Sequence, residues 1–499
     1  ASLGIDPAQP IDDSNTIYST IASGLLRPTP SEKISASTIT DAPMWIVKNP
    51  KNALLYVYDY AGSVYTIPAT MDSVSALGDL TDGGTAQGNG ASYYDNYMYF
   101  ARSTTVARYG PLDGTPVFAD DYWVTTLSKT RLTNPEYPRD YQSLAKYPSH
   151  PLLRHSDGRL YIADVVGNQG TIHYIQTTKT TVEGDTDNGS TYNALDLGYG
   201  LYPTALESYG SDIAIALYEG TGAGIDQGNA KLAFWDGTAA SPTKIIWVEF
   251  PDQIISAMKN INGILYVVSG NINSQGFRIS RFIGGYNFEE LFYSEFGEAP
   301  FAGAVDGDLN NLLIGNFTTI PGSDACIHSV GLQKSALGSG FFTPMRATSA
   351  SATTTATCIA LGDNNDLGFN VPLLGWTGGS VNAIDTQFTT YSNAPSIWWS
   401  QLYTVGSPVK IETVAIPLVQ AMGANMTLEA KMYTDDGNAV TTLATATNTN
   451  YSGKKRLVLR PNGLTAQNNF WLELRWSGST VLTVGLPIKI GVEVIDEIV

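Results

Sequence analysis

One pattern recurs along the chain and limits what it can fold into: a polar turn, a short apolar strand, a second turn and a second strand. The clearest copies are GRLYIADVVGNQGTIHYI at residues 158–175 and GILYVVSGNINSQGFRIS at residues 263–280. In both, a Gly turn precedes a Leu-Tyr-aliphatic strand, and a turn rich in Gly, Asn and Gln separates that strand from an alternating one. Such units predict β-hairpins.

Further copies give the pattern a period. Related units occur at residues 52–68, 94–110 and 208–237, and weaker ones at 306–317 and 356–371. The strand centres are Tyr56, Tyr99, Tyr161, Ile215, Tyr266, Leu313 and Phe369. Successive centres lie 43 to 62 residues apart, which is the size of one propeller blade. Because a single meander cannot bury both of its faces, we expect successive units to stack around an axis.

The sequence therefore predicts an all-β fold: a six- or seven-bladed β-propeller at residues 35–385, followed by a β-sandwich or jelly-roll module at residues 386–499. A sandwich array or a β-solenoid is the alternative to the propeller. Residues 1–34 are rich in Pro and poor in periodic apolar positions, which predicts an extended arm. Within this arm, TIYSTI (16–21) is expected either to close the ring against the last blade or to add to a neighbouring subunit's sheet.

The C-terminal module is set apart by longer and cleanly alternating strands. In FWLELRW (470–476), alternate residues point to opposite faces of the sheet. One face is expected to carry Phe470, Leu472, Leu474 and Trp476. The other is expected to carry Trp471, Glu473 and Arg475.

Composition excludes several functional classes. The formal net charge is −18 with only 28 Lys and Arg, so sequence-specific nucleic-acid binding is not expected, because phosphate binding requires clustered positive charge. No uninterrupted apolar stretch is long enough to predict a membrane span, and the N-terminal residues do not have the pattern of a secretory signal. Two cysteines, Cys326 and Cys358, exclude a disulfide scaffold; buried thiols are expected, with a pairing of the two as the alternative.

The sequence contains none of the local signatures of common enzymes. A Gly-x-Ser-x-Gly elbow, a His-Glu-x-x-His motif, a phosphate-binding loop and a dinucleotide fingerprint are all missing. The histidines lack metal spacing, and His150 and His155 are interpreted as a surface pair. The acidic pairs Asp120-Asp121 and Glu289-Glu290 are neighbours in sequence, so their side chains point to opposite faces of a strand and form no dyad. We therefore predict that the protein is not an enzyme and has no cofactor beyond a calcium candidate.

That candidate is AVDGDLNNLLIGN (304–316), which resembles the calcium loop of integrin-type propeller repeats. The resemblance implies that Asp306, Asp308 and Asn310 are the oxygen ligands. Leu309 stands where that family prefers Gly, and calcium requires six or more oxygen ligands, so the loop carries too few carboxylates. An Asp-Gly turn that leads into a hairpin is the alternative interpretation.

Aromatic residues of the C-terminal module are the other candidates for a site. Trp398, Trp399 and Trp471 are predicted to form a sugar-stacking platform, because aromatic faces bind the apolar faces of sugars. Burial of these rings in the core is the alternative.

The layout as a whole resembles that of tailed-bacteriophage virion proteins with a β-propeller, of the tail nozzle or adsorption type. The resemblance rests on an acidic propeller rich in Gly, Thr, Asn and Tyr, on the arm and C-terminal sandwich, and on the phrases YFARSTTVARYGPL (99–112) and LPIKIGVEVIDE (486–497). It implies a structural protein that is made in the host cytoplasm and assembles into the virion. Its partners would be copies of itself, as a trimer or hexamer, other tail proteins and a host-surface glycan. The alternatives are a secreted or surface carbohydrate-binding protein with a lectin-like C-terminal module, and a propeller glycosidase.

Overall fold

The computed structural model divides the chain into two compact units. Residues 33–340 and 349–386 belong to one unit, and residues 1–32, 341–348 and 387–499 belong to the other. The structure describes residues 25–26, 32–35, 38–80, 88–102, 105–123, 150–166, 169–176, 190–219, 229–238, 248–271, 276–284, 287–294, 299–308, 311–317, 325–331, 341–348, 354–364, 369–378, 380–386, 396–400, 402–435, 437, 439–478, 480, 482–485 and 487–495.

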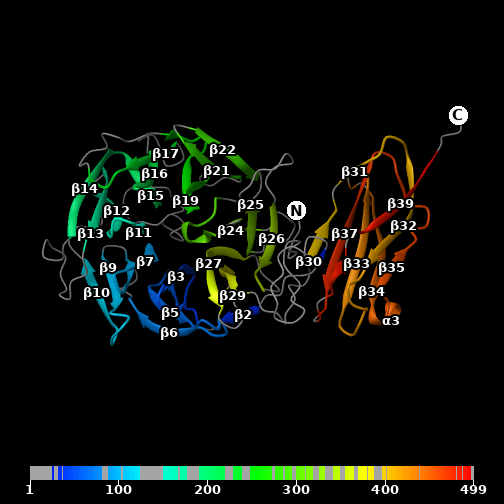
Figure 1. Ribbon diagram of the computed structural model, residues 1–499, viewed down its shortest axis with the longest axis horizontal. Coiled ribbons are helices and arrows are strands. Elements are labelled where there is room, and N and C mark those ends of the chain that lie inside the picture. The colour runs from blue at the N-terminus through cyan, green and yellow to red at the C-terminus, as the bar shows by residue number, and fades with distance from the viewer. Residues whose placement is uncertain are drawn as a thin grey trace. The chain divides into compact units, whose positions relative to one another are not determined.

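Seven four-stranded antiparallel sheets surround a common axis, which confirms the predicted propeller and sets its blade number at seven (Figure 1). Blade 1 consists of β3 (Pro43–Lys48), β4 (Leu55–Asp59), β5 (Ser63–Ile67) and β6 (Ser75–Asp79). Blade 2 consists of β7 (Gly90–Tyr94), β8 (Tyr97–Ala101), β9 (Val106–Gly110) and β10 (Val117–Trp123). Blade 3 consists of β11 (Leu152–Arg154), β12 (Leu160–Val166), β13 (Gln169–Ile175) and β14 (Ser190–Tyr199).

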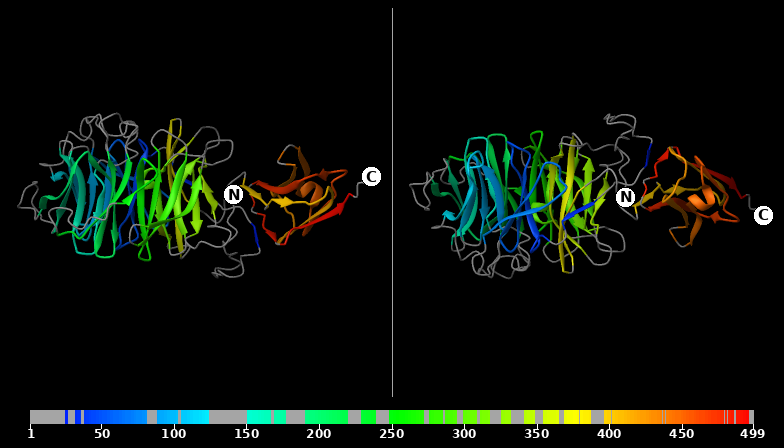
Figure 2. Two further views of the ribbon diagram at one scale, coloured as in Figure 1. Left: turned by 90° about the horizontal axis from the view of Figure 1, so that it is seen from above. Right: turned by 90° about the horizontal axis from the view of Figure 1, so that it is seen from below.

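The remaining blades repeat this order of strands, and Figure 2 shows the same ring from its edge. Blade 4 consists of β15 (Leu201–Tyr209), β16 (Asp212–Glu219), β17 (Asn229–Trp235) and β18 (Val248–Glu249). Blade 5 consists of β19 (Ile254–Ile261), β20 (Ile264–Gly270), β21 (Phe277–Gly284) and β22 (Asn287–Ser294). Blade 6 consists of β23 (Val305–Gly307), β24 (Asn311–Phe317), β25 (Ala325–Gly331) and β26 (Phe341–Arg346).

Blade 7 joins the two ends of the ring. It is built from β27 (Thr355–Asn364), β28 (Phe369–Gly378), β29 (Val381–Thr386) and, as its outer strand, β2 (Glu32–Ser35) from the beginning of the chain. Ile34 of β2 is half-buried and packs against the apolar cluster that blades 1 and 7 share. The strand that completes the last blade is therefore 32–35, which overlaps the end of the predicted arm, whereas the candidate 16–21 lies outside the described residues.

All seven strand centres from the sequence fall in the second strand of a blade, from Tyr56 in β4 to Phe369 in β28. The second strand has a hydrogen-bonded neighbour on each side, and its two faces meet the adjacent blades. In β4 every residue is buried, and Tyr99 and Tyr161 are fully buried in β8 and β12. A strand that is buried on both faces needs a continuous run of large apolar side chains, and that run is the repeat visible in the sequence.

A short 3-10 turn lies against the innermost strands of the ring. This turn, η3 (Ala302–Ala304), contacts β3, β19 and β27, the first strands of blades 1, 5 and 7. Phe301 and Ala304 are buried and form a small cluster with Ala42 and Met44 of blade 1. A Cβ atom on Gly303 would lie 2.1 Å from the Met44 carbonyl oxygen, so only glycine fits there.

The C-terminal module contains two antiparallel sheets. The five-stranded sheet contains β30 (Ser396–Trp399), β31 (Tyr403–Thr404), β33 (Thr427–Thr434), β34 (Ala439–Thr447) and β37 (Asn469–Ser477). The four-stranded sheet contains β32 (Val409–Pro417), β35 (Arg456–Leu459), β36 (Thr465–Ala466) and β39 (Lys489–Val494). The module also contains α3 (Asn448–Tyr451) and β38 (Val484–Gly485), which pairs with β1 (Leu25–Leu26).

One apolar core joins these two sheets. Phe470, Leu472, Leu474 and Trp476 of β37 all belong to it, as the alternation in FWLELRW predicts. From the four-stranded sheet, β32 contributes Val409, Ile411, Val414 and Ile416. The two sheets thus face each other as the layers of a sandwich.

Cys326 and Cys358 are both buried, and neither forms a disulfide. Burial raises the pKa of the Cys358 thiol, which keeps it protonated. The expected thiols are thus present, and the alternative pairing does not occur.

Two truncations test ring closure by β2. A chain that begins at residue 31 keeps β2, whereas one that begins at residue 38 loses it, and both lose β1. We expect the melting temperature of the shorter chain to fall by about 5 °C or more, because β29 then exposes its unpaired edge. The longer chain should melt at the same temperature as the parent in calorimetry. Equal melting temperatures for the two truncations would show that β2 does not hold the ring closed.

Candidate functional site

Polar contacts join every pair of adjacent blades near the turn between their first and second strands. They link Lys51 to Asn96, Tyr94 to Gly158, His155 to Ser208, Asn260 to Ser208, Lys259 to Asp306, Leu361 to Asp306, and Lys48 to Asp363. The first six contacts span 2.6 to 2.9 Å, and the last is an ion pair between blades 1 and 7. We call this set the rim contacts. Because they involve all seven blades, they hold the end of the ring as one unit.

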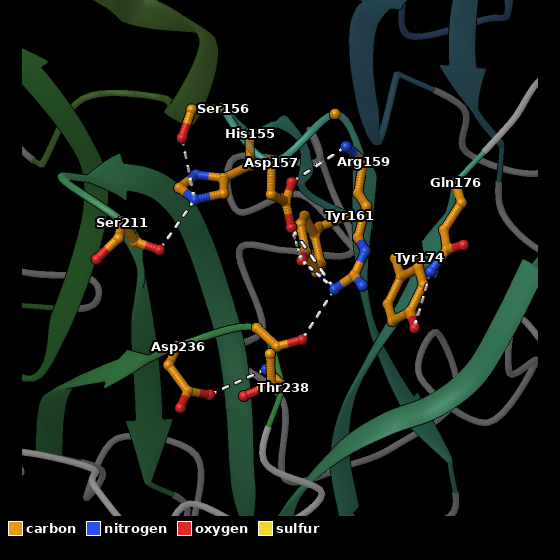
Figure 3. Close-up of polar contacts among 12 residues, drawn as sticks. His155, Ser156, Asp157, Arg159, Tyr161, Tyr174, Gln176, Ser211, Asp236 and Thr238 are labelled. Carbon is orange, nitrogen blue, oxygen red and sulfur yellow. Dashed lines mark hydrogen bonds and ion pairs between the residues drawn. The ribbon is translucent and has the colours of Figure 1, made fainter.

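The turn of blade 3 illustrates how these contacts are made (Figure 3). The Tyr161 hydroxyl donates a hydrogen bond of 2.5 Å to Asp157, and burial raises the pKa of this phenol. The Arg159 guanidinium lies over the Tyr174 ring and donates to the Gly237 carbonyl of blade 4 at 3.0 Å. On the same turn, His155 contacts the Ser208 hydroxyl. These contacts join blade 3 to blade 4, so the arrangement fits blade cohesion.

Three charged side chains meet where blades 4, 5 and 6 adjoin. The Lys259 ammonium lies 2.7 Å from the Asp306 carboxylate, which also accepts a hydrogen bond from the Leu361 amide at 2.9 Å. Lys259 also interacts electrostatically with the carboxylate of Glu207. Burial raises the pKa of Glu207 to about 7, with Asp306 adding to the rise and Lys259 opposing it. The Glu207 carboxyl group is therefore near its titration midpoint at neutral pH.

The predicted calcium ligands have other partners. Asp306 is held by Lys259, and the Asp308 side chain accepts the Asn311 amide at 2.7 Å, as in a turn that leads into a hairpin. Asn310 lies outside the described residues. Among the residues that the structure describes, no group of three or more His, Cys, Asp or Glu side chains is arranged to hold a metal ion. Calcium binding by this loop stays a prediction.

The histidines occupy different positions from those expected. The interpretation of His150 and His155 as a surface pair is wrong, because both are buried. His150 and His173 flank the buried Asp164 of blade 3, with nitrogen–oxygen separations of 3.4 and 3.5 Å. His150 precedes β11, Asp164 lies in β12 and His173 lies in β13, so the three side chains come together only when these strands pair.

The acidic pairs lie on outer strands of the ring. Asp120 and Asp121 are in β10, while Glu289 and Glu290 are in β22. Glu289 forms an ion pair with Arg281, and Glu290 with Arg278, both on the neighbouring strand β21. Glu289 and Glu290 therefore reinforce the outer edge of blade 5, and neither acidic pair belongs to an innermost strand.

The C-terminal module places two of the three predicted tryptophans around a buried carboxylate on the outer face of its five-stranded sheet. Glu473 is 1% exposed. One of its oxygens accepts a hydrogen bond from the Trp399 indole at 3.1 Å and another from the Tyr433 hydroxyl at 2.7 Å. The other oxygen lies 3.0 Å from the Arg475 guanidinium. Burial, with Glu473 nearby, raises the pKa of Tyr433 to about 12, so the phenol remains a donor at neutral pH.

Trp471 completes this group. Its ring is stacked on Tyr433, with an interplanar angle of 6° and ring centroids 5.1 Å apart. We call Trp399, Tyr433, Trp471 and Glu473 the aromatic face. Trp398, the third predicted residue, packs instead against the module's apolar core.

Tyr433 and Glu473 of the aromatic face were not predicted from the sequence as site residues. Tyr433 and Trp471 are 38 positions apart in the sequence and become neighbours because β33 and β37 pair in that register. Glu473 was expected on the outer face, but its burial depends on Trp399 from a third strand. The alternation of FWLELRW predicts which residues of β37 point to the outer face of the sheet. The order of the strands decides which side chains lie beside them.

Comparisons with known proteins extend to the propeller alone. No family model matches the chain, and no curated protein matches it. The Pan2 WD40 domain of Neurospora crassa is 10% identical over 73% of this chain and 97% of that one, with a TM-score of 0.43. The Cps50 (Swd1) β-propeller domain of Myceliophteria thermophila is 11% identical over 72% of this chain and 100% of that one, also with a TM-score of 0.43. These likenesses carry no information about what the chain binds.

The raised pKa of Glu207 predicts a pH dependence of stability. In the unfolded chain this carboxyl titrates near its ordinary value of 4.5, whereas in the native state its pKa is about 7. Its protonation therefore stabilises the fold fully below pH 4.5, and this contribution is lost as the pH rises to 7. Glu207→Gln should accordingly melt at a higher temperature than the parent at pH 8, and this difference in melting temperature should be smaller at pH 5.

Thermal unfolding at several pH values, with Glu493→Gln as the control at an exposed carboxylate, measures this effect. A difference between Glu207→Gln and the parent that does not change from pH 5 to pH 8 would contradict the raised pKa.

Proposed function

We propose that the protein is a structural component of a tailed-phage virion, which assembles through its C-terminal module into a trimer or hexamer. The observation that carries this proposal is the edge strand β34. Its sequence, AVTTLATAT, has nine residues and no charge, and it ends the five-stranded sheet. Ala439, Val440, Thr441 and Thr442 are exposed, with Val440 at 52%. A long, uncharged edge strand offers unpaired backbone groups to a further strand.

The outer strands of the propeller are different. Each carries at least one charged residue, and an edge charge opposes pairing with another chain. These residues are Asp79, Asp120, Asp121, Asp196, Glu249, Glu289, Glu290, Arg346, Glu32 and Lys33. The contrast within one chain supports β34 as an assembly edge. It also suits a chain of net charge −18, because copies of such a chain approach most easily through an uncharged strand.

The propeller would act as a rigid spacer in this assembly. The turn η3 packs against the first strands of blades 1, 5 and 7, and we place a conduit for DNA between subunits and not through the ring of one chain. An acidic surface along such a conduit would keep DNA from adhering, because like charges repel. Within the described residues, no helix is long and apolar enough to cross a membrane.

The mass of the full chain in solution, measured by light scattering after size exclusion, tests the assembly. We expect a defined trimer or hexamer at micromolar concentration. Thr441→Lys/Thr445→Lys, which adds two charges to exposed positions of β34, should shift it to a monomer of 53.5 kDa. The matched control is Ser407→Lys/Thr480→Lys, which adds the same charge at exposed positions of the module away from β34.

Two results would count against the proposal. A parent chain that is monomeric at every concentration would rule out self-assembly. An oligomer that persists in the Thr441→Lys/Thr445→Lys variant would show that the subunit contact does not involve β34. Antibodies against the purified chain provide the test of location. They should label the tails of phage particles from the same source, and failure to label any particle would overturn the assignment to a virion.

A further inference from the structure

We infer that the aromatic face of the C-terminal module is a binding site for an uncharged glycan, with a pyranose ring seated on Trp471 beside Trp399. The rings of Trp399, Tyr433 and Trp471 lie outside the apolar core and are partly exposed to solvent. Aromatic faces are electron-rich and attract C–H bonds that neighbouring oxygens polarise, as on the apolar face of a pyranose. The inference goes beyond the proposed assembly and does not require it.

The rings are held in place before any ligand arrives. Trp399 and Tyr433 both donate to one oxygen of Glu473, and Trp471 is stacked on Tyr433. Because Glu473 is buried and paired with Arg475, its position is fixed by the sheet beneath it. Binding to such a platform orders few additional side chains, which lowers the entropic cost of association.

The charges on this face favour a neutral ligand. Arg475 is paired with Glu473, and Lys431 lies 3.1 Å from Glu429 on the neighbouring strand β33. Two cations and two anions leave no net charge for an anionic sugar or a phosphate to recognise. The Arg475 side chain is 37% exposed and its guanidinium is a donor of hydrogen bonds, which suits the hydroxyl groups of a hexose. Lys431 is partly exposed and offers a second donor.

Strand pairing places the aromatic side chains beside one another on one face of the sheet. Tyr433 and Trp471 are directly opposite each other on β33 and β37, and Trp399 is opposite Glu473 on β30. Three adjacent strands therefore present their side chains at similar height. The turn after β33 also leaves room for the Trp471 ring, since Gly437 has φ near +80° and a Cβ atom added there would lie 3.3 Å from that ring.

The experiment is a glycan array probed with the full chain, followed by calorimetric titration of lactose, cellobiose and maltotriose, with 3′-sialyllactose as the anionic comparator. We expect binding of at least one neutral saccharide and weaker binding of its sialylated form. Trp471→Ala should weaken that binding by about tenfold or more, because it removes the stacking surface. Tyr433→Phe keeps the ring, loses the hydrogen bond to Glu473, and should weaken binding by a smaller factor.

Tyr199→Ala is the matched control, because it removes an aromatic side chain that is 70% exposed on the propeller. It should bind like the parent. The melting temperature of each variant is measured in parallel, and Trp471→Phe serves as a milder change if Trp471→Ala does not fold. Absence of binding to every neutral glycan, or full binding by folded Trp471 variants, would overturn the inference. Oligomeric state is read separately, so failure here is distinguishable from failure of the proposed assembly.

Discussion

The structure depends on closing a ring of sheets, none of which is stable alone. A four-stranded meander exposes two apolar faces, and each blade buries them only when neighbours stand on both sides. The joint between the first and last blades must be closed by segments that are far apart in the sequence. Here β2 completes blade 7, and the ion pair between Lys48 and Asp363 joins blades 1 and 7. The apolar cluster shared by these blades lies beneath that joint.

The other joints use different chemistry for the same purpose. At the rim contacts, a lysine, a tyrosine, a histidine or a backbone amide crosses from one blade to the next. Asp306, which the sequence suggested as a metal ligand, receives both an ammonium and an amide there. The polar groups of the rim contacts are thus paired between adjacent blades. A ring whose blades are joined in this way is suited to hold a shape.

The C-terminal module differs from the ring because it has an uncharged edge strand and partly exposed aromatic rings that a partner could contact. The uncharged strand β34 keeps a free edge in the described sheet, and the aromatic face keeps its rings partly exposed. Both features lie on one sheet, but they use different parts of it: backbone groups along the edge and side chains on the outer face. Assembly and glycan binding would therefore not compete for the same atoms. The proposed roles divide accordingly, with the propeller as support and the module as the point of contact.

The sequence by itself determined the repeating strand, its blade-sized period and the two faces of β37, because each depends on neighbouring residues and on a periodicity of two. Fully buried second strands such as β4 need uninterrupted large apolar side chains, and such runs can be recognised in the sequence alone. The tertiary structure alone decided that 32–35 completes the last blade, that His150 and His173 flank Asp164, and that Lys259 holds Asp306. It also decided that Trp399, Tyr433 and Trp471 meet at Glu473. Each of these depends on strand order and register between residues distant in sequence, where a shift of one residue reverses every side chain.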